Sequence, residues 1–215
     1  MQTLIVGSQP HSNIHFLIDA AMVFKTANEW LEDPDGIILD TETTGLEDED
    51  EIVQISVLDM DGNILLNQYM QPMFKEMHPE AFAVNGIAPE MLIDCPTWPE
   101  VWPEIEAVLA GKNMIAHSAA FDERMIVNSN KRCGLPAPPW KSVRCTNKLV
   151  LPIYGQPGDT RVSLVNACAA TGVQGGGKHE GVGDALDVLS LLHGLSRKIV
   201  RPEPAREVVR LEMRG

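Results

Sequence analysis

Three short segments between residues 36 and 70, separated by turns, are the feature that most limits how this chain can fold. Residues 36–40 form an apolar run that ends in an acid, and residues 51–59 alternate between two faces. An Asp-Gly-Asn turn then leads into a third segment, residues 64–70. Tight turns of this composition join neighbouring strands in antiparallel order. We therefore predict a three-stranded antiparallel meander.

Helical and extended patterns alternate in the remainder of the chain. Helices are predicted at residues 79–85, 89–92, 99–110, 119–131, 146–151 and 184–197, and strands at residues 113–116 and 140–145. Ser118 is predicted as the N-cap of the helix over residues 119–131. Strands that alternate with helices are typical of parallel pairing. The pattern predicts an α/β fold with a mixed sheet, in which parallel strands extend the meander and helices flank it.

The ends of the chain differ in character from the middle. Residues 13–32 carry apolar side chains at roughly helical spacing and end at an Asp-Pro-Asp-Gly turn. We divide the chain into a helical extension (residues 1–33), a main domain (residues 34–200) and a charged tail (residues 201–215). Two roles stay open for the extension: packing against the sheet, or forming a surface for a homodimer or a protein partner.

Composition excludes several classes of protein. No apolar run approaches the roughly 20 residues that span a bilayer, and Met1–Pro10 lacks the pattern of a secretory signal. The four cysteines are scattered and contain no C-x-x-C pair, which argues against a zinc ribbon or a disulfide scaffold. We expect a cytoplasmic protein with reduced thiols and no membrane partner.

The net charge of −13 is unevenly distributed. Residues 1–110 contain two lysines against 21 acidic residues, and residues 111–215 contain 15 lysines and arginines against nine acidic residues. The acidic half could hold metal ligands and the basic half phosphate contacts, or the acidic surface could only aid solubility. A chain this acidic is not expected to coat long nucleic acid non-specifically, because that binding needs many contacts from Lys and Arg to phosphate.

The strongest chemical signal is an acid pair at the end of the first strand. Asp40 and Glu42 lie two residues apart, so on an extended chain both carboxylates point to the same face. Two adjacent carboxylates stay ionised cheaply only if a cation joins them. Oxygen ligands of this kind suit Mg²⁺ or Mn²⁺.

Two further segments add acids and a histidine. Asp122 lies about one turn into the helix that follows the strand at residues 113–116. Asp184 begins a strongly apolar helix, and His179 precedes it on a glycine-rich segment. Each segment alone is a weak signal, but their order and spacing together are informative.

The three segments resemble the motifs of the DEDDh superfamily of 3′→5′ exonucleases. They read Asp-Thr-Glu-Thr-Thr-Gly from residue 40, Ala-His-Ser-Ala-Ala-Phe-Asp from residue 116, and His-x4-Asp from residue 179. The similarity runs from about residue 36 to residue 195 and is of the type found in proofreading subunits, ribonuclease T and, most closely, exonuclease X. The resemblance implies a ribonuclease-H-like fold, two divalent metal ions and release of 5′-mononucleotides from a 3′ end, with DNA favoured.

The resemblance also implies roles for individual residues. Asp40 would bridge two metals, Glu42 and Asp184 would complete one site, and Asp122 would support the other. His179 would act as general base near neutral pH. The backbone around Thr43 would meet the 3′-hydroxyl, and Leu46 would press on the last base unless it merely covers the core.

The chain departs from the family pattern at two substrate-proximal positions. Asn85 stands where histidine is usual, and Ser118 where asparagine is usual. Affinity or substrate preference could therefore differ from that of relatives.

Three alternatives stay open. The chain could be an exoribonuclease of the same superfamily, or a nuclease of the same fold that cuts internally. It could also be an interaction protein whose acidic run, residues 47–51, binds Ca²⁺ or a basic partner. That run lacks the ligand pattern of a calcium loop, so we expect it to be a solvated loop.

Overall fold

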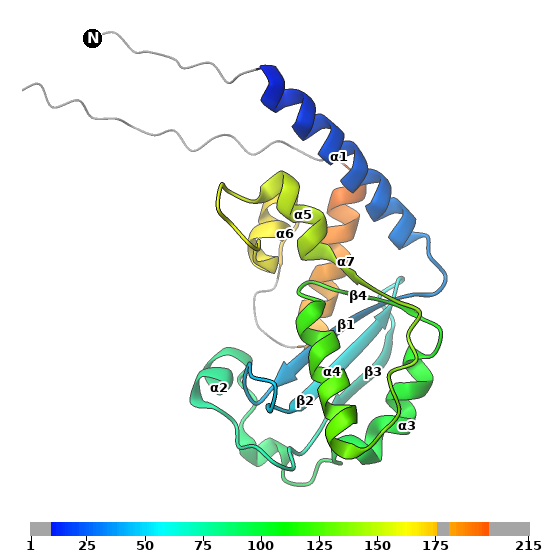
Figure 1. Cartoon of the computed structure of the whole chain (residues 1–215), viewed down its shortest axis with the longest axis vertical. Helices are drawn as coiled ribbons and strands as arrows, with labels where there is room; N and C mark the ends of the chain where they lie inside the picture. Colours follow the sequence, from blue (N-terminus) through cyan, green and yellow to red (C-terminus); the bar gives the residue numbers. More distant parts are fainter. Residues whose placement is uncertain (1–9, 176–180, 198–215) are drawn as a thin grey trace, which may run out of the picture.

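The computed structural model describes residues 10–175 and 181–197 (Figure 1). Its centre is a five-stranded sheet in the order β3-β2-β1-β4-β5. The strands are β1 (Gly36–Thr43), β2 (Ile52–Asp59), β3 (Ile64–Tyr69), β4 (Asn113–Ala116) and β5 (Ser142–Cys145). β1, β2 and β3 pair antiparallel, whereas β4 lies parallel to β1 and β5 parallel to β4. The predicted mixed sheet is confirmed.

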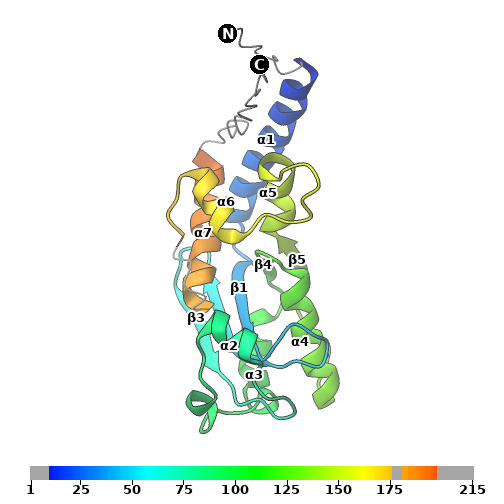
Figure 2. The same cartoon turned by 90° about the vertical axis from the view of Figure 1, so that its left-hand side faces the viewer.

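Helices cover both faces of the sheet (Figures 1 and 2). They are α1 (Pro10–Leu31), α2 (Pro79–Asn85), the short 3₁₀ helix η1 (Pro89–Leu92), α3 (Trp98–Leu109), α4 (Ala120–Cys133), α5 (Thr146–Tyr154), α6 (Leu164–Thr171) and α7 (Gly181–Arg197). None of the helices in the described ranges is both long and apolar enough to cross a membrane.

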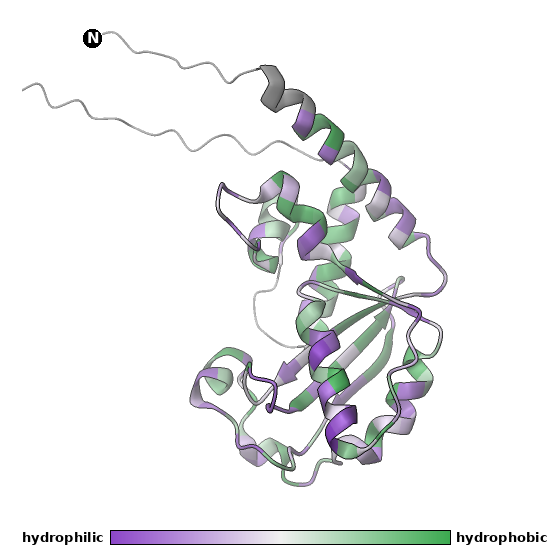
Figure 3. Ribbon diagram, in the orientation of Figure 1, coloured by the Kyte–Doolittle hydropathy of each residue, from purple (hydrophilic) through white to green (hydrophobic). Residues whose placement is uncertain are grey.

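The central strand β1 is buried on both faces because its alternating side chains enter two separate cores. Ile38 packs with residues of α7, α5 and α6, whereas Ile37 and Leu39 pack with residues of α3 and α4. α7 is coloured largely as hydrophobic in Figure 3 and buries most of its length. β1 is therefore held firmly, and its carboxyl end is a fixed platform for the residues that follow.

α1 packs mainly on other helices. It lies along α7 and α5 (Figure 1), with Val23 and Ala27 fully buried in the core shared with α7. Its outer face exposes Leu17, Ile18 and Met22. A homodimer or protein partner on this face stays a prediction.

Two local expectations were wrong, and one helix was not predicted. The unpredicted helix is α6, which begins after Ser163, whose hydroxyl accepts a hydrogen bond from the Asn166 amide at 3.3 Å. The N-cap of α4 is Ala119 and not Ser118, and no side chain caps that helix. α7 begins at Gly181, three residues earlier than predicted, because burial of the helix overrides the weak helix propensity of its glycines.

Candidate active site

Three carboxyl groups meet at the carboxyl end of β1. Asp40 and Glu42 extend from the same face of β1, and Asp184 comes from the first turn of α7. One oxygen from each lies within 4.8 Å of the others. Carboxylates grouped this closely can share a divalent cation through oxygen ligands.

A glycine allows α7 to approach the sheet closely enough to complete this group. A Cβ atom at Gly181 would lie 2.6 Å from the Ser56 hydroxyl oxygen and 3.3 Å from the Gln54 side chain. Ser56 and Gln54 belong to β2 and pair with Asp40 and Glu42 in the register of the sheet. The first turn of α7 therefore rests on β2, directly beside the two acids of β1.

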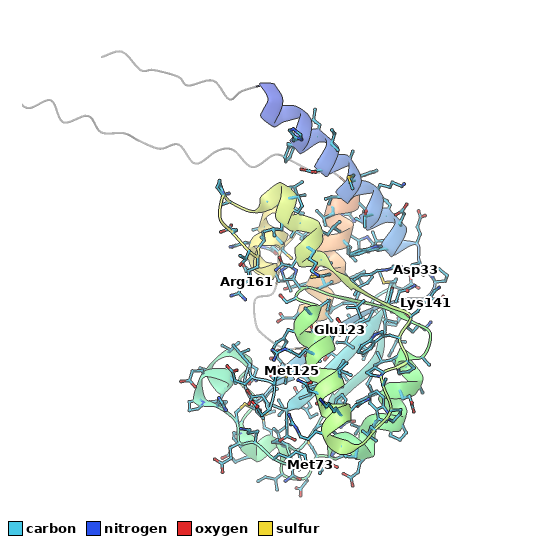
Figure 4. The ribbon with its side chains drawn as sticks, in the orientation of Figure 1. Asp33, Met73, Glu123, Met125, Lys141 and Arg161 are labelled. Carbon is cyan, nitrogen blue, oxygen red and sulfur yellow. The ribbon has the colours of Figure 1, made fainter. Side chains whose placement is uncertain are left out.

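Asp122 lies close to this group but is held by separate contacts. It is buried in the first turn of α4, near Glu123, which Figure 4 labels. One of its oxygens accepts hydrogen bonds from the Thr41 hydroxyl at 2.8 Å and the Thr41 amide at 3.2 Å. Asp122 is outside the group of three whose oxygens lie within 4.8 Å. Thr41 therefore fixes one oxygen of Asp122 beside the acids of β1.

Burial and neighbouring acids raise the pKa of Asp40 and of Glu42, and burial raises the pKa of Asp122. Burial, followed by the charges of Asp122, Glu42 and Asp184, raises the pKa of Asp40 well above its ordinary value. Burial, followed by the charges of Asp184 and Asp122, raises the pKa of Glu42 to about 8. Burial raises the pKa of Asp122 to about 6, against the lowering effect of the hydrogen bonds from Thr41. A cation among these carboxylates would relieve the repulsion, so the donor set fits a divalent metal.

A cavity of about 410 Å³ opens beside the acids, a volume within the usual range for small-molecule sites. Its lining is largely apolar and comes from the end of β1, the following loop, α2 and α4, and includes Thr43, Leu46, His78, Val84, Asn85 and Phe121. Leu46 is 73% exposed at this cavity and is not part of the core. The cavity can therefore hold a planar, partly apolar chemical group between apolar side chains, next to the acidic cluster.

The predicted substrate-binding residues occupy different places. Thr43 and Leu46 line the cavity. Asn85 also lines it but is buried, and its amide donates to the Thr43 carbonyl at 3.2 Å while its oxygen accepts from the Ile87 amide at 3.0 Å. Ser118 is exposed at the turn before α4 and does not line this cavity. His179 lies outside the described residues.

The acidic run at residues 47–51 is only partly the solvated loop that was expected: residues 47–49 are exposed, whereas Asp50 and Glu51 are buried. Asp50 is 2% exposed, and its carboxylate accepts hydrogen bonds from the Thr44 hydroxyl and the Glu47 amide, both at 2.8 Å. Glu51 is also buried, and its carboxylate accepts from the backbone amides of residues 73–75 at 2.6–2.9 Å. Each of these two buried carboxylates has the hydrogen-bond partners that burial requires. Their hydrogen bonds tie the loop to itself and to residues 73–75.

Three residues of the site were missed by sequence reasoning. Thr41 orients Asp122, and Phe121 and His78 line the cavity. Thr41 and Phe121 lie inside the first and second motifs, so their position beside the predicted acids could have indicated them. His78 has no such signal, because the turn that brings it to the cavity is not readable from local sequence.

The sheet, the acidic cluster and the adjoining cavity together define a class of protein, a candidate hydrolase with a site for divalent cations. Comparison with known proteins makes the class specific. A family model described as "Exonuclease" matches residues 37–192. An uncharacterized exonuclease, CP81, from Escherichia phage 186 is 33% identical over 190 residues, which cover 84% of this chain and 97% of that protein.

Other relatives match a smaller part of the chain or the fold. The DNA polymerase III subunit epsilon of Escherichia coli (strain K12) is 36% identical over 96 residues, which cover 40% of this chain and 39% of that one. A solved structure of exonuclease X in complex with 5′ overhanging duplex DNA aligns with a TM-score of 0.56 and 28% identity, covering 74% of this chain and 90% of that one. The nuclease domain of 3′hExo, described as a DEDDh family member, aligns with a TM-score of 0.61 at 18% identity.

The chain belongs to the exonuclease family, within the DEDDh exonuclease superfamily. The family predicted from the three motifs is confirmed, as is the ribonuclease-H-like sheet.

Proposed function

We propose that the chain removes 5′-mononucleotides from the 3′ end of a nucleic acid, with DNA favoured. The observation that carries the proposal is the group formed by Asp40, Glu42 and Asp184, with oxygens within 4.8 Å of one another beside the cavity. Membership of the exonuclease family supports phosphodiester hydrolysis. A cavity closed on several sides by β1, α2 and α4 suits the end of a chain better than its middle.

We propose two divalent metal ions, Mg²⁺ or Mn²⁺, as the cofactors. Asp40, Glu42, Asp122 and Asp184 would hold them, and the crowding that raises the pKa of Asp40 and Glu42 supports this assignment. Bound cations would stabilise the charge on the attacking and leaving oxygens of the phosphodiester.

The residues of the chain supply orientation and proton transfer. Thr41 holds Asp122 in a fixed orientation through two hydrogen bonds. Leu46 and Phe121 provide apolar walls on which the terminal base can pack. The backbone at Thr43 would meet the terminal hydroxyl, and Asn85 would act by fixing the Thr43 carbonyl. His179 would take the proton from the attacking water.

The preference for DNA rests on similarity. The solved structure of exonuclease X that resembles this chain contains duplex DNA. A second candidate function, exoribonuclease, is kept because another structure with the same fold is a 3′-exonuclease bound to a histone mRNA stem-loop. Discrimination between the two depends on contacts to the 2′-hydroxyl.

The test uses 5′-labelled single-stranded DNA and the matching RNA with purified protein and Mg²⁺ or Mn²⁺. We expect a ladder that shortens by one nucleotide at a time from the 3′ end, faster for DNA, and absent with EDTA or in Asp40→Asn. Internal cuts would instead favour an endonuclease of the same fold. Intact oligomers with folded protein and metal present would refute the proposal.

A further inference from the structure

The loop that carries Leu46 is fastened to α4 by one face of that helix. Arg124, Asn128 and Arg132 lie four residues apart and therefore share a face. Asn128 donates to the Asp48 carbonyl at 3.3 Å, and Arg132 donates to the same carbonyl at 3.0 Å. Figure 2 shows this loop, drawn in blue after β1, running beside α4. A row of donors on α4 thus lies along one side of the loop, residues 45–50, and the loop oxygens accept from it.

Arg124 contacts both walls of the cavity. Its guanidinium pairs with the Asp48 carboxylate and donates to the Leu46 carbonyl at 2.9 Å. The same guanidinium carbon lies 5.4 Å from the centre of the Phe121 ring. Leu46 and Phe121 are the apolar residues that line the cavity on the loop side and on the α4 side. One side chain therefore contacts the backbone of Leu46 and the ring of Phe121 at the same time.

The opposite side of the loop is fixed from within. The Asp50 carboxylate binds the Thr44 hydroxyl and the Glu47 amide, and it occupies the space that a side chain at Gly45 would need. Contacts on both sides therefore restrict the loop in the absence of substrate. An exposed ion pair alone contributes little to stability, but this arrangement fixes geometry.

We propose that Arg124 is a positioning residue that sets the width of the terminal-nucleotide cavity by holding Leu46 against Phe121. The inference rests on the proposed function, because it assigns that cavity to the last nucleotide of the substrate. Asp122 lies two residues earlier on the same helix, so α4 keeps the cavity in register with the acidic cluster.

The test compares Arg124→Ala, Arg124→Lys and a control, Lys131→Ala. Lys131 is exposed on the same helix, and its replacement removes the same charge; within the described residues its side chain makes no hydrogen bond or ion pair with the loop. With single-stranded DNA and Mg²⁺, we expect Arg124→Ala to raise KM about tenfold with kcat changed less than about threefold. The KM of Arg124→Lys should lie between those of the wild type and Arg124→Ala, because lysine keeps the charge but lacks the planar fork whose two nitrogens bind Asp48 and the Leu46 carbonyl.

A second measurement reports the loop itself. Amide hydrogen exchange at residues 45–50 should be faster in Arg124→Ala than in Lys131→Ala, while exchange in β1 stays the same. Unchanged KM and unchanged exchange in Arg124→Ala, with an active wild type, would overturn the positioning role alone. If the wild-type protein leaves the single-stranded DNA intact, both the proposed function and this inference are overturned.

Discussion

Four carboxyl groups share one end of the sheet, and this crowding costs the metal-free protein stability. Asp40 is the most affected, because burial and three neighbouring acids all raise its pKa. We expect Asp40→Asn to lower kcat by at least about 10³-fold, the equivalent of about 4 kcal/mol of transition-state stabilisation. The melting temperature in EDTA should not fall, because the change removes charge repulsion. A folded Asp40→Asn variant with near-wild-type turnover would contradict the assignment.

Glu42 makes stability depend on pH. Its pKa is raised to about 8 from an ordinary value of 4.5, so the folded state keeps a proton that the unfolded chain has lost. This contribution to stability is complete below about 4.5 and disappears as the pH rises through about 8. In EDTA, the wild type should therefore lose melting temperature relative to Glu42→Gln between pH 5 and 9.

Added Mg²⁺ should reverse that loss at the alkaline end, because the cation binds deprotonated carboxylates. Scanning fluorimetry across the pH range measures both effects. A wild type that gains stability relative to Glu42→Gln as the pH rises would show that the proton is not held there.

Among the elements, the first turn of α7 is the one on which the site depends most. Gly181 rests against Ser56, where a Cβ would lie 2.6 Å from the hydroxyl oxygen. We expect Gly181→Ala to push the helix outward and to lower turnover about tenfold, since overpacking in a close contact typically costs about 1–3 kcal/mol.

Ser56→Ala in the same chain should restore part of that activity, because it removes the atom that the new methyl group would meet. Steady-state kinetics of the two single variants and the double variant measure the coupling. Strictly additive effects would mean that the helix does not approach the sheet through this contact.

The meander and most helices could be predicted because their signals are local. The Asp-Gly-Asn turn fixes the pairing of β2 with β3 within a few residues. α6 was missed because residues 164–171 are apolar nearly all round, and such a run shows no helical period. The N-cap of α4 was misplaced because serine is a preferred N-cap residue. In the structure Ser118 lies in the turn between β4 and α4, and the helix begins one residue later than this preference indicates.

At the scale of the whole molecule, α1 contributes buried side chains to the core. Ala27 is fully buried against α7. We expect Ala27→Asp to destabilise the protein by at least about 3 kcal/mol, because an unpaired charge would be buried. Urea unfolding measures this, with Met22→Ala on the exposed face as the control. Equal midpoints for the two variants would mean that α1 detaches readily.

The distribution of charge predicts weak dependence on salt. Lys112 and Lys141 pair with Asp35, and Arg144 pairs with Asp33, so these cations are engaged within the protein. With few phosphate contacts, the logarithm of affinity for single-stranded DNA should fall with the logarithm of salt at a slope shallower than about −2. Fluorescence anisotropy at several salt concentrations, with Ca²⁺ in place of Mg²⁺, measures the slope. A slope steeper than about −5 would indicate an extended basic interface.

The site residues that lie in short sequence motifs could be predicted. Those that depend on contacts between distant segments could not. Asp40 and Glu42 follow from strand alternation, and Asp184 from its place in the third motif. The burial of Asp50 and Glu51 could not be predicted. In the sequence they have the pattern of surface acids, and the groups that bind them lie elsewhere in the chain. The role of Arg124 depends on a contact across 78 residues.

The acids of this site are far apart along the chain, and that spacing has a consequence during synthesis. Asp40 and Glu42 leave the ribosome long before residue 184, and the sheet face that α7 covers stays open until then. A nascent chain that ends before residue 181 therefore lacks Asp184, one acid of the group, and the residues of α7 that pack in the core on that face. We expect the proposed nuclease activity to be absent from such a chain, because packing of α7 on the sheet completes the core and the acidic group together.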